Sequence, residues 1–323
     1  MASPRIVYMG TPEFAVEPLA AIVDAGYNVV AVVTVPDKPV GRGQKLQASP
    51  VKQFAEKHGL PLLQPDKLRD EGFINLLKQL NPDIGAVVAF RMLPESVWCI
   101  PRLGTFNLHA SLLPQYRGAA PINWAIINGE RKTGLTTFFL DREMDTGIII
   151  SRQEVDIAED ETAGELHNRL MHLGANMVVN TVQLLAEGNF TPISQDRLAA
   201  GQKLNPAPKI FRETCRINWN LEVDRVYNLI RGLSPYPAAW SEMLVNADGN
   251  EVTVPVKVFR AERVVQNHKN SFGAIVTDGK RYLQVASGKG YIDIKVIQQS
   301  GKKSMPIDEF LRGWHNAILV RML

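Results

Sequence analysis

Runs of consecutive apolar residues alternate with helix-like segments over the first 190 residues of this chain. Arg5–Met9, Asn28–Thr34 and Asp83–Phe90 are almost continuously apolar, as strands covered on both faces of a sheet are. Between the first two runs, Pro12–Ala25 has apolar residues at helical spacing, and Gly26 follows as a stop signal. Strands that are connected through helices lie parallel. The alternation therefore predicts an α/β domain with a doubly wound, mostly parallel sheet.

The alternation continues to the end of a long helical segment. Glu71–Leu80 has helical apolar spacing, and Thr136–Leu140 and Ile148–Ser151 are strand candidates on either side of a turn. Thr162–Gly188 predicts a long helix, because its first residue and the glutamate three residues later form a capping box. We therefore place the first domain at residues 1–189.

The pattern changes after this helix. Residues 190–208 hold three prolines and a glycine and are predicted to be a linker. Residues 209–323 include a helix candidate, Glu222–Gly232, and then short strand candidates separated by Gly, Asn and Asp turns. These strand candidates are Val252–Arg260, Gly273–Thr277, Tyr282–Ala286 and Tyr291–Ile297. Their spacing predicts a small antiparallel β-barrel as the second domain.

Composition excludes several classes of protein. Cys99 and Cys215 are too few for a disulfide framework or a cysteine-rich metal site. Apolar runs such as Ala86–Phe90 fall far short of the roughly 20 residues that cross a bilayer. The N-terminus has neither a signal-peptide nor a transit-peptide pattern. These features argue against secreted, membrane-spanning and disordered chains, and they predict a reducing, cytoplasmic location.

Positive charge is concentrated in two regions. Residues 209–323 carry a net charge of +6 and residues 1–208 a net charge of −3, which favours an anionic partner for the second domain. The segment Pro36–Lys52 also contains four cations against one acid. A long basic loop beside a ligand cleft suits contact with a phosphate backbone. The alternative is a solvated loop that contacts no ligand.

Two polar residues stand at the end of a predicted strand, within Phe106–Gly118. Asn107 and His109 are two positions apart, so on a strand their side chains point to the same side. In open α/β sheets, ligands bind at the carboxyl ends of the strands. A neutral histidine can accept a proton there, and an asparagine amide can donate to an oxyanion. A loop histidine with satisfied hydrogen bonds is the alternative interpretation.

Asp145 begins the turn Asp145-Thr146-Gly147 between two strand candidates. Asp-Thr-Gly also marks aspartic proteases, but their chemistry needs a second aspartate in an all-β frame. A single carboxylate beside a histidine would instead orient and polarise the imidazole. An Asx-turn without a chemical role remains an alternative.

Dinucleotide and metal cofactors have no support in the sequence. Gly10-Thr11-Pro12 follows the first strand without the Gly-x-Gly-x-x-Gly pattern. The remaining histidines lack metal-ligand spacing, and His167 and His172 lie five residues apart on a helix, which is the wrong offset for one face. We expect no metal site.

The stretch FNLHASLLPQYRGAAPINW, followed by the Asp145 turn, resembles the folate-dependent formyltransferases. This resemblance implies a Rossmann-like formyltransferase domain, 10-formyltetrahydrofolate as co-substrate and a formyl-transfer reaction. It assigns catalysis to Asn107, His109 and Asp145. It also implies a folate-contacting loop at Ser111, Leu112, Leu113 and Pro114.

Within that family, nearly the whole chain is most similar to members that formylate methionyl initiator tRNA for translation initiation. VYMGTPEFAVEPL resembles their first strand and helix, and PDKPVGRGQKL resembles the insertion they use on the tRNA acceptor end. This implies tRNA contacts for Arg42, Lys38 and Lys45. IRGLSPYPAAW and GKKSMPIDEFLRG resemble their OB-like C-terminal domain, which would place tRNA on residues 209–323. We expect a monomer.

One departure and three alternatives stand beside this interpretation. Phe90-Arg91 replaces a common Tyr-Gly, and the cation at Arg91 is expected to reshape the folate pocket. Sugar-nucleotide N-formyltransferases share the HxSLLPxYRG stretch but lack the basic glycine loop. Glycinamide ribonucleotide formyltransferase resembles the first domain alone. A non-catalytic OB-type nucleic-acid-binding protein would leave Asn107, His109 and Asp145 unexplained.

Overall fold

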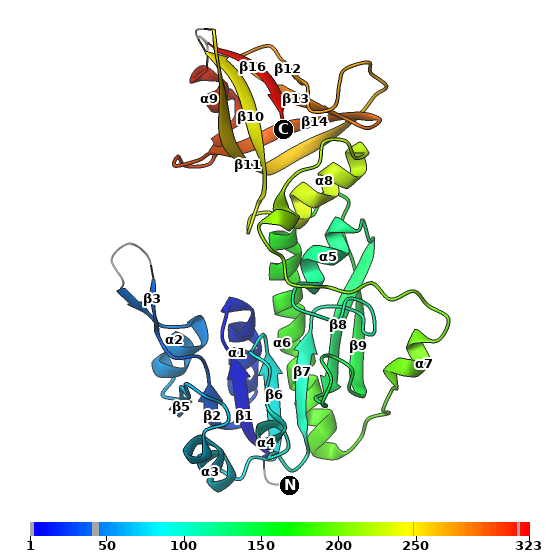
Figure 1. Ribbon diagram of the computed structural model, residues 1–323. Coiled ribbons are helices and arrows are strands. Elements are labelled where there is room, and N and C mark those ends of the chain that lie inside the picture. The colour runs from blue at the N-terminus through cyan, green and yellow to red at the C-terminus, as the bar shows by residue number, and fades with distance from the viewer. Residues whose placement is uncertain (1–2, 41–44, 248, 315–316) are drawn as a thin grey trace. The chain divides into compact units, whose positions relative to one another are not determined.

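The computed structural model describes residues 3–40, 45–247, 249–314 and 317–323 (Figure 1). The chain forms two compact units. The N-terminal unit comprises Met1–Pro121, Thr133–Val155 and His167–Ala207, and the C-terminal unit comprises Ile122–Lys132, Asp156–Leu166 and Pro208–Leu323. Each unit therefore draws on segments that are distant in the sequence.

The N-terminal unit is built on a seven-stranded sheet in the order β5-β2-β1-β6-β7-β8-β9. Its strands are β1 (Arg5–Gly10), β2 (Asn28–Val33), β5 (Leu62–Leu63), β6 (Ile84–Val88), β7 (Thr105–His109), β8 (Lys132–Phe139) and β9 (Ile149–Asp156). The first five strands pair in parallel, and β8 runs antiparallel to β7. The doubly wound, mostly parallel sheet predicted from the sequence is thereby confirmed.

The strand order reverses next to β1. The chain passes from β1 outward to β2 and β5, and it later returns to the other side of β1 with β6 and β7. In open α/β sheets such a reversal places the ligand site beyond the carboxyl ends of the strands. Residues that follow β6 and β7 are therefore positioned to meet at one edge of the sheet.

Helices flank this sheet (Figure 1). They are α1 (Val16–Asp24), α2 (Pro50–Lys57), α3 (Glu71–Gln79), α4 (Glu95–Trp98), α6 (Ala163–Glu187) and α7 (Gln195–Ala199), with a 3₁₀ turn at Glu13–Ala15. Buried Phe73 and Leu77 of α3 share a hydrophobic core cluster with Val7, Val33 and Val87 of strands β1, β2 and β6. This burial of apolar surface holds the helix on the sheet.

The predicted capping box of the long helix is present. The backbone N–H of Thr162 donates to the Glu165 carboxylate at 2.8 Å, and the backbone N–H of Glu165 donates to the Thr162 hydroxyl at 3.3 Å. Pro18 does not interrupt α1, because it lies in the first helical turn, where a missing N–H has no intrahelical partner to lose.

The basic segment after β2 forms a small antiparallel hairpin of β3 (Lys38–Val40) and β4 (Lys45–Gln47). Lys38 is exposed. Arg42 lies outside the described residues, and so does the side chain of Lys45. Two of the three cations predicted to contact tRNA, Lys38 and Lys45, thus lie on the paired strands of one hairpin.

The C-terminal unit is a barrel-like antiparallel sheet in the order β12-β13-β14-β11-β10-β16. Its strands are β10 (Ala239–Ala247), β11 (Asn250–Val265), β12 (Ile275–Thr277), β13 (Leu283–Ser287), β14 (Gly290–Gln299), β15 (Met305–Pro306) and β16 (Ala317–Met322). Met322 N–H donates to the Gly273 carbonyl at 2.8 Å, so the two ends of the sheet nearly close. The predicted small barrel is confirmed, although β10 and β16 were not predicted.

Helices α5 (Pro121–Ile127), α8 (Val223–Gly232) and α9 (Ile307–Arg312) and a 3₁₀ turn at Glu213–Cys215 complete the chain. Within the C-terminal unit, Val226 and Ile230 of α8 join the buried core of the barrel. Trp219 is buried there and donates to the Ser241 hydroxyl at 3.0 Å. Trp219 is therefore a core residue of the C-terminal unit.

Candidate active site

His109 ends strand β7 and is almost completely buried. Its Nε2 lies 2.8 Å from the backbone carbonyl oxygen of Tyr116. A carbonyl oxygen can only accept a hydrogen bond, so Nε2 must carry the proton. In the neutral ring, Nδ1 is then the nitrogen that can accept a proton.

Asp145 presents its carboxylate to that second nitrogen. Its Oδ2 lies 3.8 Å from Nδ1 of His109, which exceeds hydrogen-bond distance but permits strong attraction to a protonated ring. The same oxygen accepts a hydrogen bond from the backbone N–H of Gly118 at 2.9 Å. Asp145 and His109 have side-chain exposures of 13% and 7%, so solvent screens their interaction little.

Asn107 lies two residues before His109 on β7, on the same side of the sheet by the alternation of a strand. It is partly exposed, whereas the other four residues of this strand are buried. Its side chain can therefore reach a ligand. The structure brings Asp145 to His109 at the end of β7, and Asn107 lies two residues earlier on the same strand, within the N-terminal unit.

The loop Ser111–Pro114 continues from β7 and is held by internal hydrogen bonds. Thr136 of β8 donates its hydroxyl hydrogen to the Ser111 carbonyl at 2.7 Å, and the Leu113 N–H donates to the Thr136 hydroxyl at 3.1 Å. Ser111, Leu113 and Pro114 are buried, and Leu112 is partly exposed. The loop is thereby fixed beside the histidine, and a folate contact for its residues stays a prediction.

The segment predicted to be a linker supports the same loop. Asn205 accepts from the Tyr116 N–H at 2.7 Å, and the Ala207 N–H donates to the Arg117 carbonyl at 2.8 Å. Gly118 has φ +124°, and a Cβ there would lie 2.4 Å from the Ala207 oxygen, so only glycine fits. The same segment contains Gln195, which contacts the Asp145 loop and which no motif indicated.

Two further cations, Arg91 and Lys52, form hydrogen bonds away from His109. Arg91 donates to the carbonyl oxygens of Asp66 and Pro65, at 3.0 and 2.5 Å, and it lies near the Phe90 ring. Lys52 pairs with Asp37 at 2.7 Å. This hydrogen bond raises the pKa of Lys52 and lowers the pKa of Asp37. Neither cation joins the cluster around His109.

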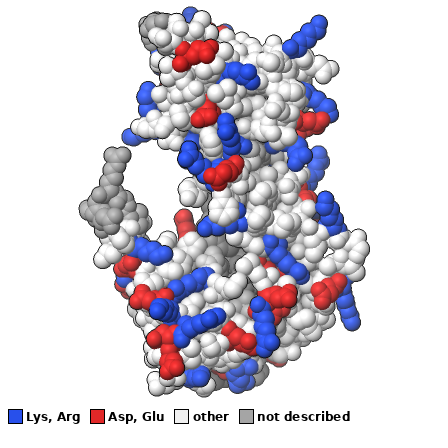
Figure 2. Space-filling view, in the orientation of Figure 1, with Lys and Arg blue, Asp and Glu red and all other residues white. Residues whose placement is uncertain are grey.

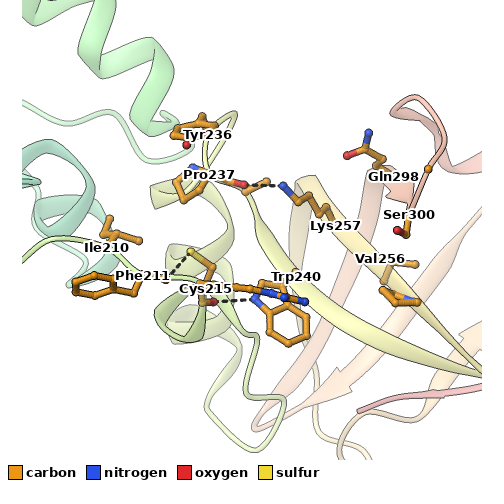
Figure 3. A pocket seen from close by; sticks show the side chains of 14 residues that line it. Ile210, Phe211, Cys215, Tyr236, Pro237, Trp240, Val256, Lys257, Gln298 and Ser300 are labelled. Atoms are coloured by element: carbon orange, nitrogen blue, oxygen red, sulfur yellow. Dashed lines mark hydrogen bonds between the residues drawn. The ribbon is translucent and has the colours of Figure 1, made fainter. Parts of the chain in front are cut away.

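A hollow of about 510 Å³ lies on the C-terminal unit (Figure 3). Exposed Tyr236 and Phe211 line it together with the cations Arg212 and Lys257. Of the described residues that line it, none is acidic. Figure 2 shows lysine and arginine side chains spread over this unit, with acidic side chains among them.

Within the described ranges, no group of three or more His, Cys, Asp or Glu side chains could hold a metal ion. In the same ranges, no helix combines the length and the apolar character that a membrane crossing needs.

Structures of similar fold are known. The sugar 3N-formyl transferase WlaRD, crystallised with dTDP and 5-N-formyl-THF, matches with a TM-score of 0.64 at 17% identity, over 94% of this chain and 100% of that one. HypX from Aquifex aeolicus, in complex with tetrahydrofolic acid, matches with a TM-score of 0.62 at 17% identity, over 96% of this chain and 47% of that one. At this identity the likeness establishes the fold alone.

Sequence relatives are much closer. The family model "Formyl transferase" matches residues 4–182, and "Formyl transferase, C-terminal domain" matches residues 209–315. A protein of Bacteroides fragilis named methionyl-tRNA formyltransferase is 58% identical over 311 residues, which are 96% of this chain and 95% of that protein. One of the same name from Flavobacterium johnsoniae is 49% identical over 310 residues, 96% of each chain. The chain therefore belongs to the formyl transferase family and, within it, to the methionyl-tRNA formyltransferases.

Proposed function

We propose that this chain transfers the formyl group of 10-formyltetrahydrofolate to the α-amino group of methionine on initiator tRNA, for translation initiation. One observation carries the proposal. The 58% identity to a relative named methionyl-tRNA formyltransferase extends over 96% of the chain and so takes in both units. The arrangement at the end of β7 supplies side chains suited to the chemistry.

The reaction joins the amine nitrogen to the formyl carbon. The neutral amine attacks, and the carbonyl electrons move to oxygen to give a tetrahedral oxyanion. When this intermediate collapses, the bond between the formyl carbon and the folate nitrogen N10 breaks. The amine loses a proton, and N10 gains one. Because a free α-amino group has a pKa of about 7.7–8, little work is needed to obtain the neutral amine at neutral pH.

His109 is proposed to carry that proton. Its Nε2–H is used by the Tyr116 carbonyl, which leaves Nδ1 to accept the proton from the amine and to pass it toward N10. The Asp145 carboxylate, 3.8 Å from Nδ1, would stabilise the imidazolium that forms. Asn107, on the same side of β7, would donate its amide hydrogen to the oxyanion. No covalent bond to the protein is needed.

The substrate contacts are proposed from charge and position. Ser111, Leu112, Leu113 and Pro114 continue directly from the catalytic strand and are assigned to the folate. Lys38, Arg42 and Lys45 are assigned to the tRNA acceptor end.

The hollow of the C-terminal unit is assigned to the RNA as well. Cations such as Lys257 neutralise phosphates, and exposed aromatic rings such as Tyr236 stack on unpaired bases.

The test compares two amine substrates. The chain is incubated with 10-formyltetrahydrofolate and, in parallel, with methionyl initiator tRNA or an amino-sugar nucleotide, and formyl incorporation is measured. We expect the tRNA to be formylated. Formylation of the sugar nucleotide alone would assign the chain to the alternative, the sugar-nucleotide N-formyltransferases.

A pair of variants separates an enzyme from a binding protein. His109→Asn should abolish formylation while tRNA binding persists. His172→Asn, which replaces an exposed histidine of α6, should leave formylation and tRNA binding unchanged. Unaltered formylation by His109→Asn would contradict the catalytic assignment. We further propose that the chain acts in the cytoplasm. We also propose that it is a monomer, and size-exclusion chromatography with light scattering would check its oligomeric state.

A further inference from the structure

Gln195 joins the two loops that hold the catalytic carboxylate. It is the first residue of α7 and is only 2% exposed. Its Nε2 donates to the carbonyl oxygens of Asp145 at 3.0 Å and Gly147 at 2.8 Å. Its Oε1 accepts from Nε of Arg117 at 3.0 Å and from Nη2 at 2.7 Å.

These four contacts use both amide hydrogens and both lone pairs of the Gln195 side chain. A glutamate of the same shape could still accept from Arg117. It would, however, turn an oxygen toward two carbonyl oxygens, which cannot donate to it. The contacts at position 195 therefore require an amide side chain, such as that of Gln195, and not a carboxylate.

The loop that Gln195 holds has an unfavourable backbone. Asp145 has φ +57°, in the left-handed region that favours glycine; aspartate enters it more readily than most residues but still at some cost, which contacts of the loop offset. Gly147 lies against the backbone of β8, where a side chain would not fit, because a Cβ at this position would lie 1.8 Å from the Phe139 carbonyl oxygen. Both residues accept a hydrogen bond from Gln195 through their carbonyl groups.

The opposite loop contains the group that orients the carboxylate. Gly118, next to Arg117, donates its N–H to Oδ2 of Asp145, the oxygen that faces His109. Gln195 thus fixes both partners of that hydrogen bond, one through the Asp145 carbonyl and the other through the Arg117 side chain. Loss of Gln195 would allow the carboxylate to move relative to Nδ1 of His109.

We infer that Gln195 is a positioning residue for formyl transfer, which sets the place of the Asp145 carboxylate against His109 without touching the reacting atoms. The inference rests on the proposed function. Displacement of a catalytic group by about 1 Å can cost roughly 100-fold in rate. Gln195→Ala should therefore lower kcat by about 10- to 100-fold. KM for folate and KM for tRNA should each stay within about threefold, because the substrate-contacting residues are unchanged.

A double-mutant cycle with Asp145→Asn tests the route by which Gln195 acts. If Gln195 works through the carboxylate, Gln195→Ala should cost less than about threefold in kcat once Asp145 is already Asn. Gln195→Glu should lose at least as much kcat as Gln195→Ala, although it keeps the acceptor for Arg117. Gln183→Ala, which removes an exposed glutamine of α6, is the matched control and should retain wild-type kinetics.

The outcomes are distinct. Equal losses from Gln195→Ala in both backgrounds, or wild-type kcat in Gln195→Glu, would overturn the inference while the proposed function stands. Absence of methionyl-tRNA formylation by the unaltered chain would overturn the proposed function itself. If Gln195→Ala fails to fold, Gln195→Glu and Gln195→Met preserve the side-chain volume, and the same cycle is run with them.

Discussion

The carboxylate of Asp145 lies 3.8 Å from Nδ1 of His109, while the other ring nitrogen donates to the Tyr116 carbonyl at 2.8 Å. The tautomer of the histidine is therefore set by a backbone oxygen, and the carboxylate faces Nδ1, the nitrogen proposed to gain a proton. This arrangement, with a backbone carbonyl on one ring nitrogen and a carboxylate facing the other, differs from a triad in which the carboxylate itself accepts the imidazole N–H. It leaves Asp145 free to accept the Gly118 N–H, which ties the carboxylate to the loop after Pro114.

Asn107→Ala should lower kcat for formylation by about 10²–10³, because one donor to the oxyanion is lost. KM for either substrate should change little, since the oxyanion forms only after binding. Steady-state kinetics measure both parameters. Asn168→Ala, which removes an exposed amide of α6, serves as the control. Near-normal kcat in Asn107→Ala would contradict the oxyanion assignment.

Arg42→Ala should raise KM for methionyl initiator tRNA far more than KM for 10-formyltetrahydrofolate, because the removed charge is assigned to the RNA. Initial rates with each substrate varied in turn measure the two effects. Lys57→Ala, an exposed cation at the end of α2, should change neither value. An equal rise in both KM values would point to misfolding instead of a lost RNA contact.

Lys257→Gln and Tyr236→Ala should separate charge from stacking in the hollow of the C-terminal unit (Figure 3). Removal of a phosphate contact should reduce the slope of log K against log salt concentration by about 1. Loss of a stacked base should cost about 1–3 kcal/mol of binding free energy and leave that slope unchanged. Filter binding of tRNA over a range of salt concentrations measures both. Wild-type affinity in both variants would exclude RNA from this hollow.

Asp83→Asn should destabilise the chain at neutral pH but much less in acid. The Arg5 N–H donates to the Asp83 carboxylate at 2.9 Å and Arg102 pairs with it at 2.8 Å, which lowers its pKa below 3.8. A depressed pKa means that the ionised group favours the folded state. Its contribution is therefore full above pH 3.8 and is lost as the pH falls through the folded-state pKa.

Urea unfolding at pH 6 and pH 3 tests this dependence on Asp83. The difference in free energy of unfolding between the wild type and Asp83→Asn should shrink at the lower pH. An equal difference at both pH values would show that the carboxylate contributes nothing through its charge.

The sequence by itself determined the features that depend on near neighbours. The apolar runs of β1, β2 and β6 are long enough to specify buried strands, and the Thr162–Glu165 capping box starts its helix through contacts only three residues apart. The two-residue spacing of Asn107 and His109 likewise follows from the period of a strand. These features need no knowledge of what lies across the fold.

Only the tertiary structure decided how Asp145 is held against His109. The sequence analysis already names Asp145 as a site residue, but the 3.8 Å approach of its carboxylate to Nδ1 depends on packing between segments remote in the sequence. So does the hydrogen bond that its carbonyl accepts from Gln195, which lies in a proline-containing stretch that carries no motif. Similarly, β10 and β16 are neighbours in the sheet although they are far apart in the sequence, and no local pattern predicted either strand. The physical reason is the same in each case. A hydrogen bond between distant segments is specified by the packing that brings them together, and a local sequence pattern contains no record of it.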